Sequence, residues 1–169
     1  DGRVTGVIID VRDNPGGIKD EGVKCADLLL PSGKILIEKN NQGKKKVARA
    51  DGQCADFEYV VLVNGNTASA AELFTANIRD HKLGAIVGTN TFGKGIMQTT
   101  YPLSRYGYDG ALKLTTQYYD PPVGENYQGI GIAPDVECAL SEEAQKINFN
   151  LLTDANDNQL RRAVEALRG

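Results

Sequence analysis

The stretch Asn64-Gly-Asn-Thr-Ala-Ser-Ala-Ala-Glu-Leu-Phe-Thr-Ala-Asn77 begins as a turn and continues with residues that favour a helix. It follows an apolar run, residues 57–63, which we expect to form a buried strand. Asn64-Gly65 is typical of a tight hairpin, but the helix formers after it favour a strand–turn–helix unit. Such a unit places Ser69 at a helix N-terminus, where the helix dipole and free N–H groups favour negative charge.

Taken alone, Ser69 has a simple structural interpretation. Ser69 and Glu72 match the S-x-x-E pattern of a capping box, in which the two side chains satisfy free N–H groups at a helix start. This local pattern favours capping over catalysis.

A second turn, Gly88-Thr-Asn-Thr-Phe-Gly-Lys-Gly95, brings Lys94 25 residues after Ser69. It begins like a phosphate-binding loop, but Gly95 stands where a Ser or Thr would hold magnesium. The next residues, 96–102, are β-branched and end in proline, so the helix that such a loop requires is not expected. Serine and lysine are instead the two groups of a serine–lysine hydrolase, because an amine kept neutral by desolvation can take the hydroxyl proton.

Composition excludes several classes of protein. The length of 169 residues suits one domain, and the net charge of −3 comes from mixed signs, which argues against nucleic-acid binding. No apolar run approaches the ~20 residues needed to cross a membrane. The three cysteines, Cys25, Cys54 and Cys138, lack metal-ligand spacing, so neither a metal nor a cofactor is expected, and their pairing stays open.

The other elements alternate between strands and helices. Residues 4–11 are expected to form a buried strand that ends in the turn Arg12-Asp-Asn-Pro-Gly-Gly17. That turn is either an ordinary connection or a backbone that approaches a ligand closely, as an oxyanion hole requires. Helices are expected over residues 19–30 and 154–167, and further strands over residues 34–38, 46–50, 85–88, 99–103 and 110–119. This order argues for an α/β fold.

The single histidine, His81, follows Ser69 by twelve residues on the same expected helix. Twelve residues span about 18 Å along a helix axis, so the two side chains cannot touch. A position at the helix C-terminus, favoured by the dipole, explains His81 better than a Ser-His-Asp triad does.

Four motifs occur in an order that resembles the carboxyl-terminal processing peptidases, also called tail-specific proteases. They are Val7-Ile-Ile-Asp-Val-Arg-Asp-Asn-Pro-Gly-Gly17, Val63-Asn-Gly-Asn-Thr-Ala-Ser-Ala-Ala-Glu-Leu73, Val87-Gly-Thr-Asn-Thr-Phe-Gly-Lys-Gly-Ile-Met-Gln98 and Gly129-Ile-Gly-Ile-Ala-Pro-Asp135. The resemblance implies that Ser69 is the nucleophile, Lys94 the general base and Gln98 the residue that orients the lysine.

The resemblance also implies an oxyanion hole, whose N–H donors would be Gly16, with Gly17 as the less favoured choice, and Ala70. A lysine that acts as a base needs a dry pocket, and three apolar neighbours are expected to help build one: Phe92, Ile96 and Met97.

The resemblance further implies the repeated β-β-α core shared with Clp proteases and crotonases, as one peptidase domain over residues 1–169. The N-terminal segment and the PDZ domain that usually precede this core are absent from the sequence. The expected substrates are protein or peptide C-terminal tails, without nucleic acid or metal, and a homo-oligomer stays open. The sequence itself gives no location; the resemblance implies an exported, periplasmic or extracytoplasmic membrane-face location in a bacterium.

Three functions are open at this point. The first is a serine endopeptidase that cleaves near protein C-termini through an acyl-enzyme. The second is a non-catalytic binding or scaffold module of the same fold. The third is a crotonase-like acyl-CoA enzyme, against which the pairing of Ser69 with Lys94 argues.

Overall fold

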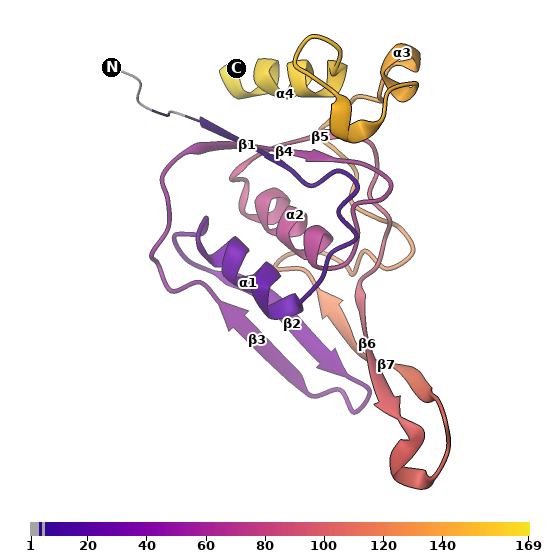
Figure 1. Cartoon of the computed structure of the whole chain (residues 1–169). Coiled ribbons are helices and arrows are strands. Elements are labelled where there is room, and N and C mark those ends of the chain that lie inside the picture. Colours follow the sequence, from indigo (N-terminus) through magenta and orange to yellow (C-terminus); the bar gives the residue numbers. More distant parts are fainter. Residues whose placement is uncertain (1–3, 5) are drawn as a thin grey trace.

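The computed structural model describes residue 4 and residues 6–169, whose strands form two four-stranded sheets (Figure 1). The first sheet is parallel, in the order β1 (Gly6–Asp10), β4 (Glu58–Val63), β5 (Gly84–Gly88) and β8 (Val136–Glu137). The second is antiparallel, in the order β3 (Lys45–Arg49), β2 (Lys34–Asn40), β7 (Ala111–Asp120) and β6 (Ile96–Pro102). Residue 5 of the expected first strand lies outside the described residues.

Strand β4 is covered on both faces, which explains its uninterrupted apolar sequence. Val60 and Leu62 pack with residues of α4 (Asn158–Arg168) on one face. Val61 and Val63 belong to the larger core on the other face, which includes α1 (Lys19–Asp27) and α2 (Ala70–His81). Because successive side chains of a strand point to opposite faces, one apolar run supplies both cores.

Helix α2 lies between the two sheets, with α1 beside it (Figure 1). Its residues 70–78 are all buried, and the Asn77 side-chain amide donates a hydrogen bond of 3.0 Å to the Ile35 carbonyl of β2. The remaining helices are short: the 3₁₀ helices η1 (Leu103–Tyr106) and η2 (Phe149–Leu151), and α3 (Glu142–Gln145). No helix within the described residues has the length and apolar character to cross a membrane.

The structure confirms the α/β class and the strand–turn–helix unit around Ser69. Three expected boundaries were wrong by three or four residues, and the others by at most two. Helix α1 ends at Asp27 because Leu29 and Leu30 continue in a tighter turn before Pro31. Helix α4 begins only at Asn158 because Asp157 caps it by accepting from the Leu160 N–H at 2.9 Å. Strand β6 begins at Ile96 instead of residue 99 and so contains Gln98.

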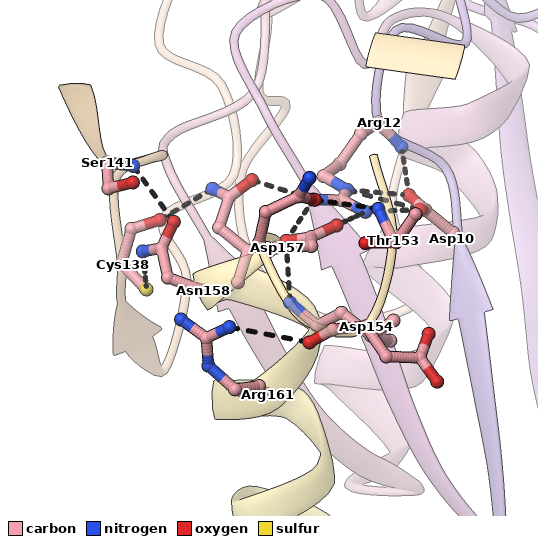
Figure 2. Close-up of polar contacts among 12 residues, drawn as sticks. Asp10, Arg12, Cys138, Ser141, Thr153, Asp154, Asp157, Asn158 and Arg161 are labelled. Carbon is pink, nitrogen blue, oxygen red and sulfur yellow. Dashed lines mark hydrogen bonds and ion pairs between the residues drawn. The ribbon is translucent and has the colours of Figure 1, made fainter. Parts of the chain in front are cut away.

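A buried arginine ties the residues before α4 to the end of β1 (Figure 2). The Arg12 Nη2 lies 2.7 Å from both Asp10 Oδ2 and Asp157 Oδ2. Its Nη1 donates to Asp157 Oδ1 at 3.1 Å and to Gln159 Oε1 at 2.9 Å. The guanidinium also lies over the Phe149 ring, 4.8 Å from its centroid. Segment 149–159 is therefore joined to the chain just after β1.

This cluster predicts how stability depends on pH. Burial acts to raise the pKa of Asp157, but hydrogen bonds from Arg12 and from the Leu160 N–H, with the charge of Arg12, lower it below its ordinary value. A lowered folded-state pKa gives stability that is present above the unfolded-state pKa and is lost as pH falls through the folded-state pKa. We expect Asp157→Asn to flatten the acid side of the stability curve.

The measurement is the free energy of unfolding in urea between pH 5 and pH 2.5. Asp154→Asn is the matched control, because the Asp154 carboxylate takes part in no ion pair among the described residues. Parallel curves for wild type and Asp157→Asn would contradict the prediction.

Candidate active site

Ser69 stands immediately before α2 in a strained backbone conformation, with φ 56° and ψ −116°. A residue with a side chain pays of order 1–3 kcal/mol for such a conformation, which persists only where its surroundings impose it. Two bonds impose it here: the Thr67 hydroxyl donates to the Val11 carbonyl at 2.7 Å, and the Ala68 N–H donates to the Asn14 carbonyl at 3.0 Å. The turn before Ser69 is thus fixed to the turn that follows β1.

The carboxylate of Glu72 joins the start of α2 to the lysine turn. Its Oε2 accepts from the N–H groups of Ser69 at 2.9 Å and Lys94 at 2.7 Å. Its Oε1 accepts from the Thr91 hydroxyl and the Gly93 N–H, both at 2.6 Å. The Glu72 arm of the expected capping box is therefore present, and three of its four donors come from another part of the chain.

The lysine turn is braced from its far side by the fourth sequence motif. Thr91 N–H donates to the Ile132 carbonyl at 3.1 Å, and Ile132 N–H donates to the Thr91 hydroxyl oxygen at 2.7 Å. The Thr91 hydroxyl proton is then directed to Glu72. Gly131 allows this approach, since a Cβ there would lie 2.3 Å from the Thr91 carbonyl oxygen.

Ser69, Lys94 and Gln98 line one cavity of about 270 Å³. The structure therefore brings all three expected residues together, from the start of α2, the lysine turn and strand β6. Among the described residues, no hydrogen bond joins the Ser69 hydroxyl to the Lys94 amine or the Gln98 side chain to Lys94. The backbone of both residues is fixed by Glu72, whereas their side chains are not bonded to each other.

The surroundings of the lysine differ in part from expectation. Ile96 and Met97 line the cavity, but Phe92 is 63% exposed, so its expected place in the pocket was wrong. The reason is that Thr91 and Gly93 on either side of it both turn inward to Glu72. Phe92 is left facing outward.

Three residues of the cavity were not among the expected site residues: Lys19, Lys113 and Tyr119. Lys19 forms ion pairs with Glu38 and Asp20. Burial raises the pKa of Tyr119 to about 12, so its phenol stays neutral and cannot serve as a base near pH 7. Only the folding of α1 and β7 against the turn places these side chains here.

The glycine turn after β1 touches the nucleophile's backbone. Gly16 has φ 84°, and a Cβ there would lie 2.5 Å from the Ala68 carbonyl oxygen and 2.7 Å from the Ala70 nitrogen. Only glycine permits this contact. The Gly16 N–H, however, donates to Asn14 Oδ1 at 2.9 Å, whereas the described contacts include no acceptor for the Gly17 N–H. Of the two expected glycines, Gly16 thus has its N–H occupied within the turn, whereas Gly17 does not among the described contacts.

A second cavity of about 270 Å³ adjoins the first, and Gly17 and Ala70 line both. Apolar side chains make up most of its wall: Ile9, Val11, Ile18, Ala71 and Phe74. The two candidate N–H donors therefore stand between a cavity that holds Ser69 and Lys94 and one suited to an apolar side chain.

Residues 2–138 match the model of peptidase family S41. The chain belongs to this family. It is 40% identical over 157 residues to the carboxy-terminal-processing protease of Bartonella bacilliformis, covering 88% of this chain and 35% of that protein. It is 37% identical over 166 residues to the carboxyl-terminal-processing protease of Synechocystis, covering 97% and 37%.

Solved structures agree with the S41 assignment. The photosystem II D1 C-terminal processing protease has a TM-score of 0.74 and 34% identity, covering 92% of this chain and 41% of that chain. Tricorn protease, with a TM-score of 0.62 and 20% identity, shows the fold alone. The expected family and the Clp protease/crotonase-like fold class are thus confirmed. The chain spans little more than a third of the length of these two curated relatives.

Two remaining expectations for this S41 chain concern His81 and the cysteines. His81 ends α2, at the opposite end from Ser69, and its Nε2 donates to the Lys34 carbonyl at 2.7 Å. The expectation that it lies out of reach of Ser69 is confirmed. Cys25, Cys54 and Cys138 are free thiols.

The Glu72 contacts predict the effect of Glu72→Gln. The carboxamide would turn an NH₂ group toward N–H donors at one of the two oxygen positions, leaving buried donors without an acceptor. We expect a loss of about 1–3 kcal/mol in the free energy of unfolding and a displaced lysine turn. Urea unfolding measures the first effect, and amide hydrogen exchange at residues 91–95 measures the second.

Glu143→Gln is the control, because Glu143 is an exposed helix residue. Equal stabilities of the two variants would show that Glu72 does not hold the two segments together.

Proposed function

We propose that this S41 chain is the peptidase core of a serine endopeptidase that cleaves near protein C-termini, with Ser69 as nucleophile and Lys94 as general base. One observation carries the proposal. A single buried carboxylate, Glu72, accepts from the backbone N–H groups of both residues, and both side chains line the same cavity. The names of the relatives supply the substrate class, protein C-terminal ends.

The proposed reaction begins with proton transfer from the Ser69 hydroxyl to the neutral Lys94 amine. The serine oxygen attacks the scissile carbonyl carbon, and the resulting oxyanion accepts hydrogen bonds from the N–H groups of Gly17 and Ala70. The N-terminus of α2 adds favourable dipole charge at this point. The Lys94 ammonium then gives its proton to the leaving amine, and an acyl-enzyme on Ser69 remains for hydrolysis by water.

The positions of the two cavities support one orientation of the bound substrate chain. The carbonyl would lie at Gly17 and Ala70, so the side chain on its acyl side enters the apolar cavity bounded by Ile9, Val11 and Phe74. We infer a preference for an apolar residue there. Gln98 fits the orienting role, because its amide oxygen can accept from Lys94 without adding a negative charge.

A binding or scaffold module is the second candidate, favoured by the absence of a Ser69–Lys94 hydrogen bond in the described structure. Unliganded active sites often have long catalytic contacts that tighten with substrate, so this observation also fits a resting peptidase. Labelling by a fluorophosphonate probe separates the two candidates. A peptidase core is labelled at Ser69, whereas a binding module is not.

Substitutions in the dyad test the proposed roles. We expect Ser69→Ala and Lys94→Ala each to abolish cleavage of a tailed peptide while the fold is retained. Since the two residues act as a unit, the double variant should be scarcely worse than either single variant. Lys94→Arg should also be inactive, because a guanidinium cannot accept the serine proton.

The readouts are product formation by mass spectrometry and the circular dichroism of each variant. Lys113→Ala is a matched control, since that lysine lines the same cavity from β7. Multiplicative losses in the double variant, or activity in Lys94→Arg, would remove the dyad from the mechanism.

The pH dependence of cleavage tests which group is the base. An amine accepts a proton only in its neutral form, whose fraction grows as pH rises. We therefore expect the rate to rise with pH through a single ionisation, measured as initial cleavage rates from pH 5 to pH 10. His81→Ala should leave the profile unchanged. A profile controlled by a group that titrates near the ordinary histidine value of ~6.5, and lost in His81→Ala, would identify His81 as the base.

A further inference from the structure

We propose that segment 149–159 positions the oxyanion turn, and that Asp157 is a positioning residue which acts on this turn through Arg12. The inference rests on the proposed peptidase function. The family match ends at residue 138, so it assigns no role to this segment. Figure 2 shows Arg12 between Asp10, the last residue of β1, and Asp157, from the segment.

Arg12 and Asp157 form a buried, bidentate ion pair. The side chains of Arg12 and Asp157 are 4% and 3% exposed, whereas that of Asp10 is 40% exposed. The two terminal nitrogens of Arg12 each donate a hydrogen bond to a different carboxylate oxygen of Asp157. Such a bidentate contact fixes direction as well as distance. Loss of one partner would leave the buried guanidinium with incomplete compensation.

Arg12 begins the turn that carries the candidate oxyanion donor. The next residue, Asp13, accepts from the side-chain amides of Asn64 at 2.9 Å and Asn66 at 2.7 Å. Asn14 then accepts from Ala68 N–H and Gly16 N–H. These bonds hold the turn to the residues before Ser69. The Arg12 side chain holds it from the opposite direction, to segment 149–159.

The position of Gly17 therefore depends on anchors from two parts of the chain. Gly17 comes directly after the last bonded residue of the turn, and its N–H must lie near 2.9 Å from the developing oxyanion. If Asp157 no longer orients Arg12, the start of the turn is held by fewer bonds and the Gly17 N–H is less well placed. The apolar cavity also touches this turn, but much of its wall comes from Ile18, Ala71 and Phe74, so substrate binding should change less than the placement of the Gly17 N–H.

The experiment compares Asp157→Asn with Asp154→Asn in the full 169-residue chain, below the melting temperature of both. The substrate is a chromogenic peptide with an apolar residue before the scissile bond. We expect Asp157→Asn to lower kcat about tenfold with KM changed less than twofold, because misplacement of a catalytic group acts on the transition state. Amide hydrogen exchange at residues 11–17 should quicken in this variant alone. Asp157→Glu, which keeps the charge, should recover part of kcat.

A second variant covers the case in which Asp157→Asn does not fold. Gln159→Leu removes one acceptor of Arg12 and should lower kcat about threefold, the scale of one net hydrogen bond. An unchanged kcat in the folded variants, or faster exchange spread evenly over the chain, would overturn the inference. If wild type neither cleaves nor reacts with a fluorophosphonate probe, the proposed peptidase function fails. The exchange data still decide whether Asp157 holds the turn.

Discussion

The buried carboxylate of Glu72 is the interaction on which the rest of the site depends. A side chain with 0% exposure and a negative charge is costly unless hydrogen bonds replace its hydration. Glu72 has four donors and no cation among the described contacts, and three of the donors belong to residues 91–94. Because three of the four donors come from residues 91–94, the buried carboxylate is fully hydrogen-bonded only when helix α2 and the lysine turn are folded together.

The parallel sheet explains why distant motifs meet at this carboxylate. The turn 12–17 follows β1, the turn 64–69 follows β4, and the turn 89–95 follows β5, and these three strands are neighbours in the sheet. Parallel strands present their carboxyl ends at one edge, which is where ligands bind in open α/β sheets. Helix α2 is buried between the two sheets and cannot shift, so Ser69 is held at that edge. The antiparallel sheet adds Gln98 and Lys113 from its own strands.

Features that depend on neighbouring residues in the sequence, such as helix starts and turns, were predicted from local patterns. The helix formers after Asn64 predicted a helix that starts at Ser69, and the turn around Lys94 was recognised by its glycines. The resemblance to a known family then supplied the fold and the pairing of Ser69 with Lys94. Other features depended on tertiary contacts that no local pattern contains. In the sequence, Glu72 matched only a capping residue. Its bonds to Thr91 and Gly93 join residues 19 and 21 positions apart, so no local pattern could predict them.

Contacts of the same kind explain the remaining differences. The Gly16 N–H is occupied by the Asn14 side chain, whose direction the sequence does not give. Strand β8 has only two residues, and it exists because Val136 and Glu137 pair with the end of β5. The site thus combines a backbone held by hydrogen bonds with Ser69 and Lys94 side chains that are not bonded to each other. Its turns are fixed at Ser69, Gly93 and Lys94 by hydrogen bonds to one buried group. Formation of the proposed dyad therefore requires side-chain rotation within a finished frame and no rearrangement of the fold.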